Sequence, residues 1–202
     1  MDIIKVLQQE LQIAYKQAEA AVQLIDEGNT IPFIARYRKE VTGSLDDEVL
    51  RNLDERLRYL RNLEEKKEQV LASIREQEKL TPELEKQILD AMTMVAVDDL
   101  YRPYRPKRRT RAMIAKERGL EPLADLISLQ MTKEPVEKLA EDYVSAEKEV
   151  LTAEDAVAGA KDILAERISD NADYRTYIRK ATMEQGMIRS SAKDEKLSLI
   201  HI

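Results

Sequence analysis

The chain has 202 residues, 43% of them apolar, with 5 glycines, one histidine and no cysteine. This length and apolar content suffice for one large domain or two small ones with a real core, and they exclude a disordered tail. The lack of cysteine excludes disulfides, thiolate metal ligands and thiol nucleophiles, and the net charge of −6 argues against a protein that coats nucleic acid uniformly. Scarce glycine and only 4% aromatic residues predict an all-α fold.

Three short helices are expected at the N-terminus. Apolar residues recur at helical spacing in two stretches before Gly28, which is a natural C-terminal cap. The stretch "TIPFIARYRKE" predicts a third helix with Pro32 in its first turn. Its candidates for the buried side are Phe33, Ile34 and Tyr37. Short helices joined by tight turns resemble a helix-turn-helix, although such packing is common without any role in DNA binding.

A long central helix is the next prediction. Ser44, with Asp47 three residues later, forms a capping pattern, and neither glycine nor proline follows until Pro82. From Leu45 to Lys79 such a helix would span roughly 50 Å at 1.5 Å per residue. One apolar stripe runs along it, interrupted by the charged stretch "EEKKE". The stripe consists of Val49, Leu50, Leu53, Leu57, Leu60, Leu63, Val70, Leu71 and Ile74.

Capping patterns locate the remaining helices. Thr81, Thr110 and Thr152 each precede a stretch with helical periodicity, where a hydroxyl can accept a hydrogen bond from the first turn. A last helix is expected over residues 172–185, and Gly186 stops it. The chain therefore predicts helices throughout, with no internal repeat and no low-complexity linker.

No residues suggest catalysis. His201 is the sole histidine and lies second from the end, and no glycine-rich phosphate loop is present. Asp98 and Asp99 diverge by about 100° on a helix, so they are interpreted as charge balance for the basic residues that follow rather than as a cation site. We therefore expect no enzymatic activity, no metal, no cofactor and no small-molecule substrate.

No stretch suggests export or a membrane. The N-terminus "MDIIKVLQQELQ" is amphipathic and acidic, unlike a secretion signal. No apolar run approaches the roughly 20 residues that cross a bilayer. We therefore expect a cytoplasmic protein without a membrane partner.

The most unusual feature is the basic segment, Tyr101–Arg111, with the sequence "YRPYRPKRRTR". Pro103 and Pro106 are expected to hold its backbone extended and to splay the basic side chains. Arginines arranged in this way can grip a phosphate backbone while a tyrosine stacks on a base. The candidate nucleic-acid-binding residues are Tyr104, Arg105, Lys107, Arg108, Arg109 and Arg111.

Charge alone leaves three interpretations of the basic segment. It favours first a structural connection, whose tyrosines pack inward and whose arginines pair with acidic helices, then phosphate binding, then an acidic protein partner. A secondary basic cluster consists of Arg36, Arg38 and Lys39. Arg36 and Lys39 would share a helix face, from which Tyr37 turns aside. A mixture of core and surface residues is the favoured interpretation of this cluster.

Two long blocks carry a family resemblance. They read "NTIPFIARYRKEVTGSLDDEVLRNLDERLRYLRNLEEKK" and "DDLYRPYRPKRRTRAMIAKERGLEPLADLI". In this order they closely resemble the N-terminal region of the bacterial Tex family of transcription accessory proteins, over about residues 1–185. The resemblance implies an all-α, multi-helix region with helix-turn-helix-like parts and one long central helix. Two subdomains, 1–43 and 44–185, are considered, with 186–202 as a tail or the truncated start of a further domain.

The resemblance also implies a function. Members of the family are large cytoplasmic proteins related to a eukaryotic transcription elongation factor, with an RNase-H-like domain, helix-hairpin-helix elements and an oligonucleotide-binding barrel after this region. The chain resembles the first portion alone, so we expect a non-enzymatic scaffold that binds RNA or DNA weakly without the barrel. The alternative is a protein-interaction scaffold that docks RNA polymerase or the missing C-terminal domains.

Overall fold

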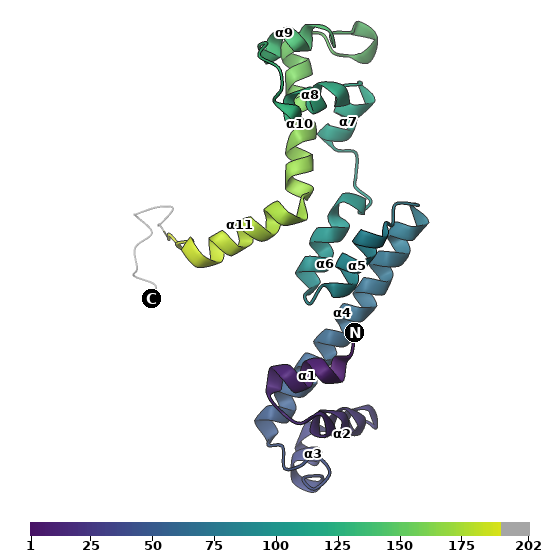
Figure 1. Ribbon diagram of the computed structural model, residues 1–202, viewed down its shortest axis with the longest axis vertical. Helices are drawn as coiled ribbons and strands as arrows, with labels where there is room; N and C mark the ends of the chain where they lie inside the picture. Colours follow the sequence, from purple (N-terminus) through teal and green to yellow (C-terminus); the bar gives the residue numbers. More distant parts are fainter. Residues whose placement is uncertain (191–202) are drawn as a thin grey trace, which may run out of the picture. The chain divides into compact units, whose positions relative to one another are not determined.

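The structure, a computed structural model, describes residues 1–190 (Figure 1). This part of the chain contains eleven α-helices, two short 3-10 helices and no strand, which confirms the all-α prediction. None of the helices within it is long and apolar enough to cross a membrane. The chain divides into two compact units, Met1–Arg105 (unit 1) and Pro106–Ile202 (unit 2). The boundary considered between residues 43 and 44 lies inside unit 1, where both of its sides share one core.

Unit 1 opens with α1 (Ile3–Leu11), α2 (Tyr15–Asp26) and α3 (Ile31–Tyr37), the three short helices that the sequence predicts. Gly28 follows the end of α2 with φ +85°, the left-handed conformation that suits a glycine at a helix C-terminus. The prediction that Tyr37 lies on the buried side of α3 was wrong, because this side chain is 61% exposed. The helix-turn-helix interpretation of these three helices stays a prediction.

Unit 1 is built around α4 (Asp47–Glu76), a helix of 30 residues that is about 45 Å long at 1.5 Å per residue. It begins later than predicted: Asp46 is the N-cap and accepts from the Val49 amide at 2.8 Å, whereas Ser44 is left-handed with φ +64°. The predicted apolar stripe is confirmed. Its buried members are Leu50, Leu53, Leu57, Leu60, Leu63, Val70, Leu71 and Ile74.

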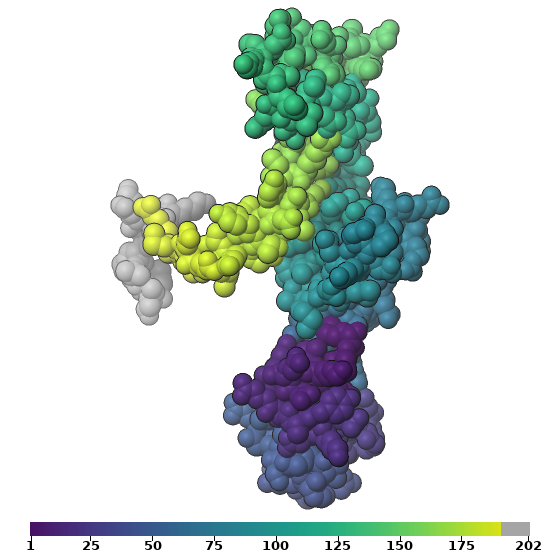
Figure 2. All heavy atoms as spheres, in the orientation of Figure 1, coloured from purple at the N-terminus to yellow at the C-terminus, as the bar shows by residue number. Residues whose placement is uncertain are grey.

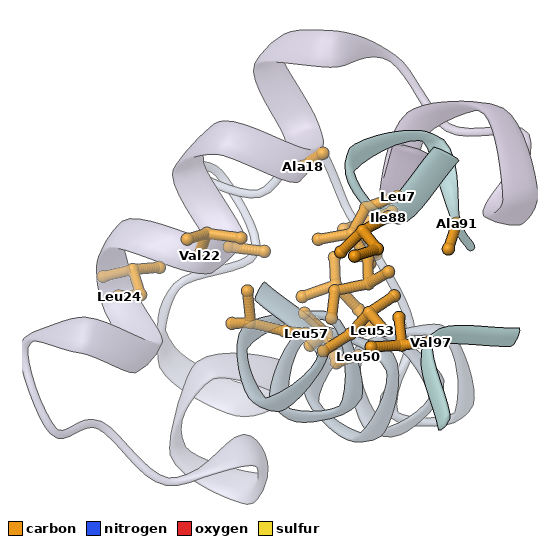
Figure 3. Packing of buried hydrophobic residues seen from close by; sticks show 14 of the residues in the cluster. Leu7, Ala18, Val22, Leu24, Leu50, Leu53, Leu57, Ile88, Ala91 and Val97 are labelled. Carbon is orange, nitrogen blue, oxygen red and sulfur yellow. The ribbon is translucent and has the colours of Figure 1, made fainter. Parts of the chain in front are cut away.

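The other helices of unit 1 cover this stripe. The N-terminal helices α1–α3 lie along the first half of α4, and α5 (Pro82–Asp90) and α6 (Met94–Tyr101) lie along its second half (Figure 1). Figure 3 shows Leu53 and its neighbours on the face of α4 that is turned toward the helices carrying Leu7 and Ile88. One continuous apolar core therefore links the start of the chain to α6.

A buried charge lies within the stripe of α4 without breaking it. Lys67 is 2% exposed, and its ammonium donates to the Leu89 carbonyl at 2.7 Å and pairs with Glu64 at 2.9 Å. The N-terminal ammonium of Met1 also binds Glu64, at 2.7 Å. Lys67 lies four residues after Leu63 and three before Val70, so its helical position continues the stripe that the charged stretch was expected to interrupt.

Unit 2 is built around α10 (Ala153–Asp170). The helices that precede it are α7 (Arg111–Glu117), α8 (Glu121–Leu129), α9 (Val136–Glu141) and the 3-10 helix η2 (Ala146–Lys148). The capping predictions are confirmed here: Thr110 accepts from the Met113 amide, and Thr152 forms a capping box with Asp155. Small side chains dominate the core, and Gly159 lies where an added Cβ would come within 2.4 Å of a Leu120 methyl carbon.

The last helix described, α11 (Ala172–Gln185), has the predicted bounds. It leaves the end of α10 at a bend (Figures 1 and 2), and Asn171 caps it by accepting from the Tyr174 amide at 3.0 Å. No residue of α11 is buried. The expectations for His201 and for most of the segment 186–202 lie outside the described residues.

Candidate functional site

The basic segment, Tyr101–Arg111, belongs to both units, because the boundary between them falls between Arg105 and Pro106. Tyr104 and Arg105 end unit 1. The other four candidate residues, Lys107, Arg108, Arg109 and Arg111, begin unit 2. The candidate residues are therefore divided between the two units, and each group takes its surroundings from its own unit.

The tyrosines of the segment pack inward in unit 1. The Tyr101 hydroxyl hydrogen-bonds with the Ser73 hydroxyl at 2.9 Å, and the Tyr104 carbonyl accepts from the Gln77 amide group at 2.9 Å. Both rings are half-buried against the apolar core. Because the Tyr104 ring already packs against protein, it is poorly placed to stack on a base.

The backbone of the segment is only partly extended. The prediction of an extended chain at Pro103 was wrong, because Arg102–Tyr104 forms the 3-10 turn η1, in which a proline is well accommodated. Arg105 is extended, with φ −65° and ψ 130°, as the residue before Pro106 is expected to be. From Pro106 to Thr110 the chain has no regular secondary structure.

Lys107 supports the fold of unit 2. Its ammonium lies between two carboxylates of α10, pairing with Asp170 and, at 3.3 Å, with Glu166. The Thr110 hydroxyl donates to the same Glu166 carboxylate at 3.1 Å. These contacts tie the start of unit 2 to the C-terminal half of α10, so Lys107 is not a free phosphate ligand.

Arg109 forms an ion pair with Glu117, and exposure to solvent weakens this pair. Its guanidinium donates to Glu117 at 2.7 Å, but the two side chains are 69% and 59% exposed. Exposed pairs of this kind contribute about 0–1 kcal/mol, because water and salt screen them. Arg109 can therefore exchange Glu117 for a phosphate at little cost.

Three arginines of the segment remain available. Arg105, Arg108 and Arg111 are exposed, and no carboxylate within residues 1–190 pairs with any of them. Of the two aspartates expected to balance the basic residues, Asp98 pairs with Lys66 of α4 at 3.3 Å, and Asp99 is buried. The structure therefore separates one structural lysine from three arginines that face solvent.

The secondary basic cluster lies on unit 1. Because α3 ends at Tyr37, the prediction that Arg36 and Lys39 share a helix face was wrong: Arg38 and Lys39 belong to the turn that follows. All three basic side chains are exposed. Among residues 1–190 no three histidine, cysteine or acidic side chains gather in a way that could hold a metal ion.

Comparison with known proteins gives two family matches. Residues 1–75 match the family described as the Tex-like protein N-terminal domain, and residues 130–200 match the one described as Tex central region-like. The secondary basic cluster lies within the first match, and the basic segment lies between the two.

Relatives of known sequence cover most of the chain. Protein tex of Bordetella pertussis is 49% identical over 194 residues, which is 96% of this chain and 24% of the relative. Transcriptional accessory protein Tex of Neisseria gonorrhoeae is 45% identical over 196 residues, 97% of this chain and 26% of the relative. S1 RNA-binding domain-containing protein 1 of Homo sapiens is 29% identical over 180 residues, 88% of this chain and 18% of the relative. The chain thus spans about a quarter or less of the curated relatives' length.

Proposed function

The chain belongs to the Tex family, and from this premise we propose that it is the N-terminal helical scaffold of a transcription accessory protein that binds RNA. The observation that carries the proposal is the set of three exposed arginines, Arg105, Arg108 and Arg111, that no carboxylate within residues 1–190 neutralises. Arg109 can contact a phosphate as well, once that phosphate replaces Glu117 as its partner. The name of the human relative refers to RNA binding by that protein and supports this choice of ligand.

The proposed contact is to the phosphate backbone. A guanidinium offers a planar fork of donors that matches two phosphate oxygens, so exposed arginines bind phosphate without reading sequence. With Tyr104 packed against the core, the basic segment has no free aromatic ring of its own for stacking. The segment should therefore bind RNA and DNA weakly and depend strongly on salt.

The role is proposed as non-enzymatic and cytoplasmic. The name of the Neisseria gonorrhoeae relative describes a transcriptional accessory protein and no catalytic activity. The buried lysine of unit 1, Lys67, donates to the Leu89 carbonyl and pairs with Glu64, so it has the environment of a structural group. A scaffold that positions an RNA-contacting surface needs no further chemistry.

The proposal is tested by removing the three arginines together. We expect that Arg105→Ala, Arg108→Ala and Arg111→Ala, combined in the full chain, weaken binding to single-stranded RNA by at least tenfold in fluorescence anisotropy at low salt. The matched control combines Arg51→Ala, Arg58→Ala and Arg75→Ala. It removes the same charge from side chains that are 62%, 74% and 65% exposed but already pair with carboxylates.

Equal weakening in both combinations would mean that net charge alone attracts RNA, and the proposal would be withdrawn. Unchanged affinity in the first combination would remove the basic segment as a contact. Circular dichroism of both proteins checks that the helices are intact.

A second candidate function is docking of protein, either RNA polymerase or further domains of a longer chain. The observation that favours it is α11, where Tyr174, Tyr177 and Ile178 are 52%, 73% and 59% exposed on neighbouring turns. Apolar side chains at this spacing form a helix face suited to another protein. Capture of RNA polymerase by the chain from nuclease-treated lysate, and its loss in Tyr177→Ser with Ile178→Ser, would support this function.

A further inference from the structure

A second surface of unit 1 combines aromatic and basic side chains. We call it the α3 platform: Phe33, Arg36 and Tyr37 of α3, with Arg38 and Lys39 of the turn that follows. The rings of Phe33 and Tyr37 lie one helical turn apart, with centroids 5.3 Å apart and planes tilted by 47°. The Arg38 guanidinium lies 5.3 Å from the centroid of the Phe33 ring. The Phe33 ring therefore lies beside both the Tyr37 ring and the Arg38 guanidinium.

The cations of the platform are not neutralised. Arg36, Arg38 and Lys39 are exposed, and within residues 1–190 none of their side chains pairs with a carboxylate. Among the described residues, the Arg38 guanidinium donates to the neighbouring Tyr37 carbonyl alone, at 3.3 Å. Glu40 follows directly in the chain and is exposed, but no ion pair joins it to these cations. The platform therefore keeps most of its positive charge for a ligand.

The backbone that carries these cations is held in place. Thr42 is fully buried, and its hydroxyl lies 3.3 Å from the Arg38 carbonyl and 3.4 Å from the Lys39 carbonyl. The Lys39 carbonyl also accepts from the Ser44 amide at 2.7 Å. Gln17 of α2 donates to the Gly43 carbonyl at 2.9 Å. A turn fixed at both ends presents its side chains in one arrangement and reduces the entropy lost on binding.

The exposure of Tyr37 is not explained by packing. Ile34 and Ala35 bury α3 against the rest of unit 1, whereas the Tyr37 ring is 61% exposed and no hydrogen bond of its hydroxyl is seen within residues 1–190. An acidic peptide would use the three cations but would not need an aromatic ring beside them. Nucleic acid uses both, because bases stack on aromatic rings while phosphates bind the neighbouring cations.

We infer that the α3 platform binds single-stranded nucleic acid, with a base stacked on Tyr37 and the flanking phosphates bound by Arg36 and Lys39. This site is separate from the basic segment in residues and in mode. The basic segment supplies arginines without a free ring, whereas the α3 platform supplies an exposed ring that is adjacent in sequence to exposed cations.

The chain itself offers a direct test, because it contains no tryptophan. Tyr37→Trp in the full chain places a single fluorescent indole at the proposed stacking position. We expect oligouridylate to quench its emission at saturation, and an abasic phosphate chain of equal length to leave it nearly unchanged. Tyr177→Trp, at a side chain that is 73% exposed on α11, is the matched control and should not be quenched.

Affinity gives a second measurement. Stacking of one base contributes enough that Tyr37→Ala should weaken binding of oligouridylate by roughly 5- to 100-fold, while Tyr37→Phe, which keeps the ring, should bind like the unchanged chain. Because the side chain is exposed, both variants should fold, and their thermal unfolding checks this.

The outcomes distinguish this inference from the proposed function. Quenching that persists when Arg105, Arg108 and Arg111 are replaced with alanine shows a platform that acts independently of the basic segment. Binding of oligouridylate to the Tyr37→Trp protein without quenching overturns the inference, even where the basic segment binds. Equal quenching by a polyglutamate peptide would assign the platform to an acidic protein partner and would overturn it as well.

Discussion

The two units achieve helix packing with different side chains. In unit 1, 4 of the 20 buried core residues are alanine, and leucine and isoleucine fill most of the space around α4. In unit 2, 6 of the 11 buried core residues are alanine, and Gly159 brings α10 close to Leu120. A core of large side chains is sensitive to lost volume, whereas a core of small ones is sensitive to added volume.

The largest expected effect comes from deleting volume in unit 1. Leu60 is fully buried on α4, so Leu60→Ala should lower the free energy of unfolding by about 2–5 kcal/mol, through lost apolar burial and the cavity left behind. Chemical denaturation measures this loss, and hydrogen exchange shows where it falls. Leu89→Ala, at a side chain that is 51% exposed, is the control and should cost far less. Similar costs for the two variants would contradict a tightly packed core in unit 1.

Unit 2 should instead be destabilised by a larger side chain in its core. Gly159→Val would bring its Cβ within 2.4 Å of a Leu120 methyl carbon, which is too close, and within 3.3 Å of the Ala115 Cβ. We expect a loss of about 1–3 kcal/mol in the free energy of unfolding. Ala158→Val adds valine at the adjacent exposed position of α10 and is the matched control. A Gly159→Val protein as stable as this control would show that the helices can move apart freely.

The smallest expected effect is the loss of stability at acidic pH. The Arg61 guanidinium lowers the pKa of Asp26. Burial raises the pKa of Glu64, but the N-terminal ammonium and Lys67 outweigh this effect, so the pKa of Glu64 is lowered as well. Carboxyl groups with lowered pKa values stabilise the fold above their unfolded pKa of about 4 and lose this contribution as the pH falls through the folded value.

The melting temperature should therefore be steady from neutral pH to about 5 and should fall below about 4. Asp26→Asn should reduce this acid sensitivity while costing less than about 1 kcal/mol at neutral pH, because Asp26 and Arg61 are each 46% exposed. Thermal unfolding followed across pH for both proteins measures the difference. If the melting temperature of the Asp26→Asn protein falls below about pH 4 as steeply as that of the unchanged chain, the acid sensitivity belongs to other carboxyl groups.

Local interactions made much of the fold predictable. A cap such as Thr152 with Asp155 uses residues three apart, so the pattern is visible in the sequence. The stripe of α4 was equally readable, because its period follows from the geometry of one helix. Lys67 was missed because its chemical type contradicts burial, although its spacing from Leu63 matches the stripe.

Properties that depend on distant residues were not predictable. Tyr37 was expected inside, but whether a ring on a two-turn helix is covered depends on what packs there. In the basic segment, the charge pattern could not distinguish Lys107 from Arg108. The two differ because Asp170 and Glu166, some sixty residues later in the chain, lie beside Lys107. Membership of the Tex family, in contrast, was recognisable from two blocks of sequence.

The central claim is that Arg105, Arg108 and Arg111 contact phosphates, and the salt dependence of RNA binding tests it most directly. Each phosphate contact on a single strand contributes about 0.7 to the slope of log affinity against log salt. Replacing the three arginines with alanine should therefore reduce the magnitude of this slope by about 2, while the control replacement of Arg51, Arg58 and Arg75 should leave it nearly unchanged. An equal slope in the two proteins would contradict the claim.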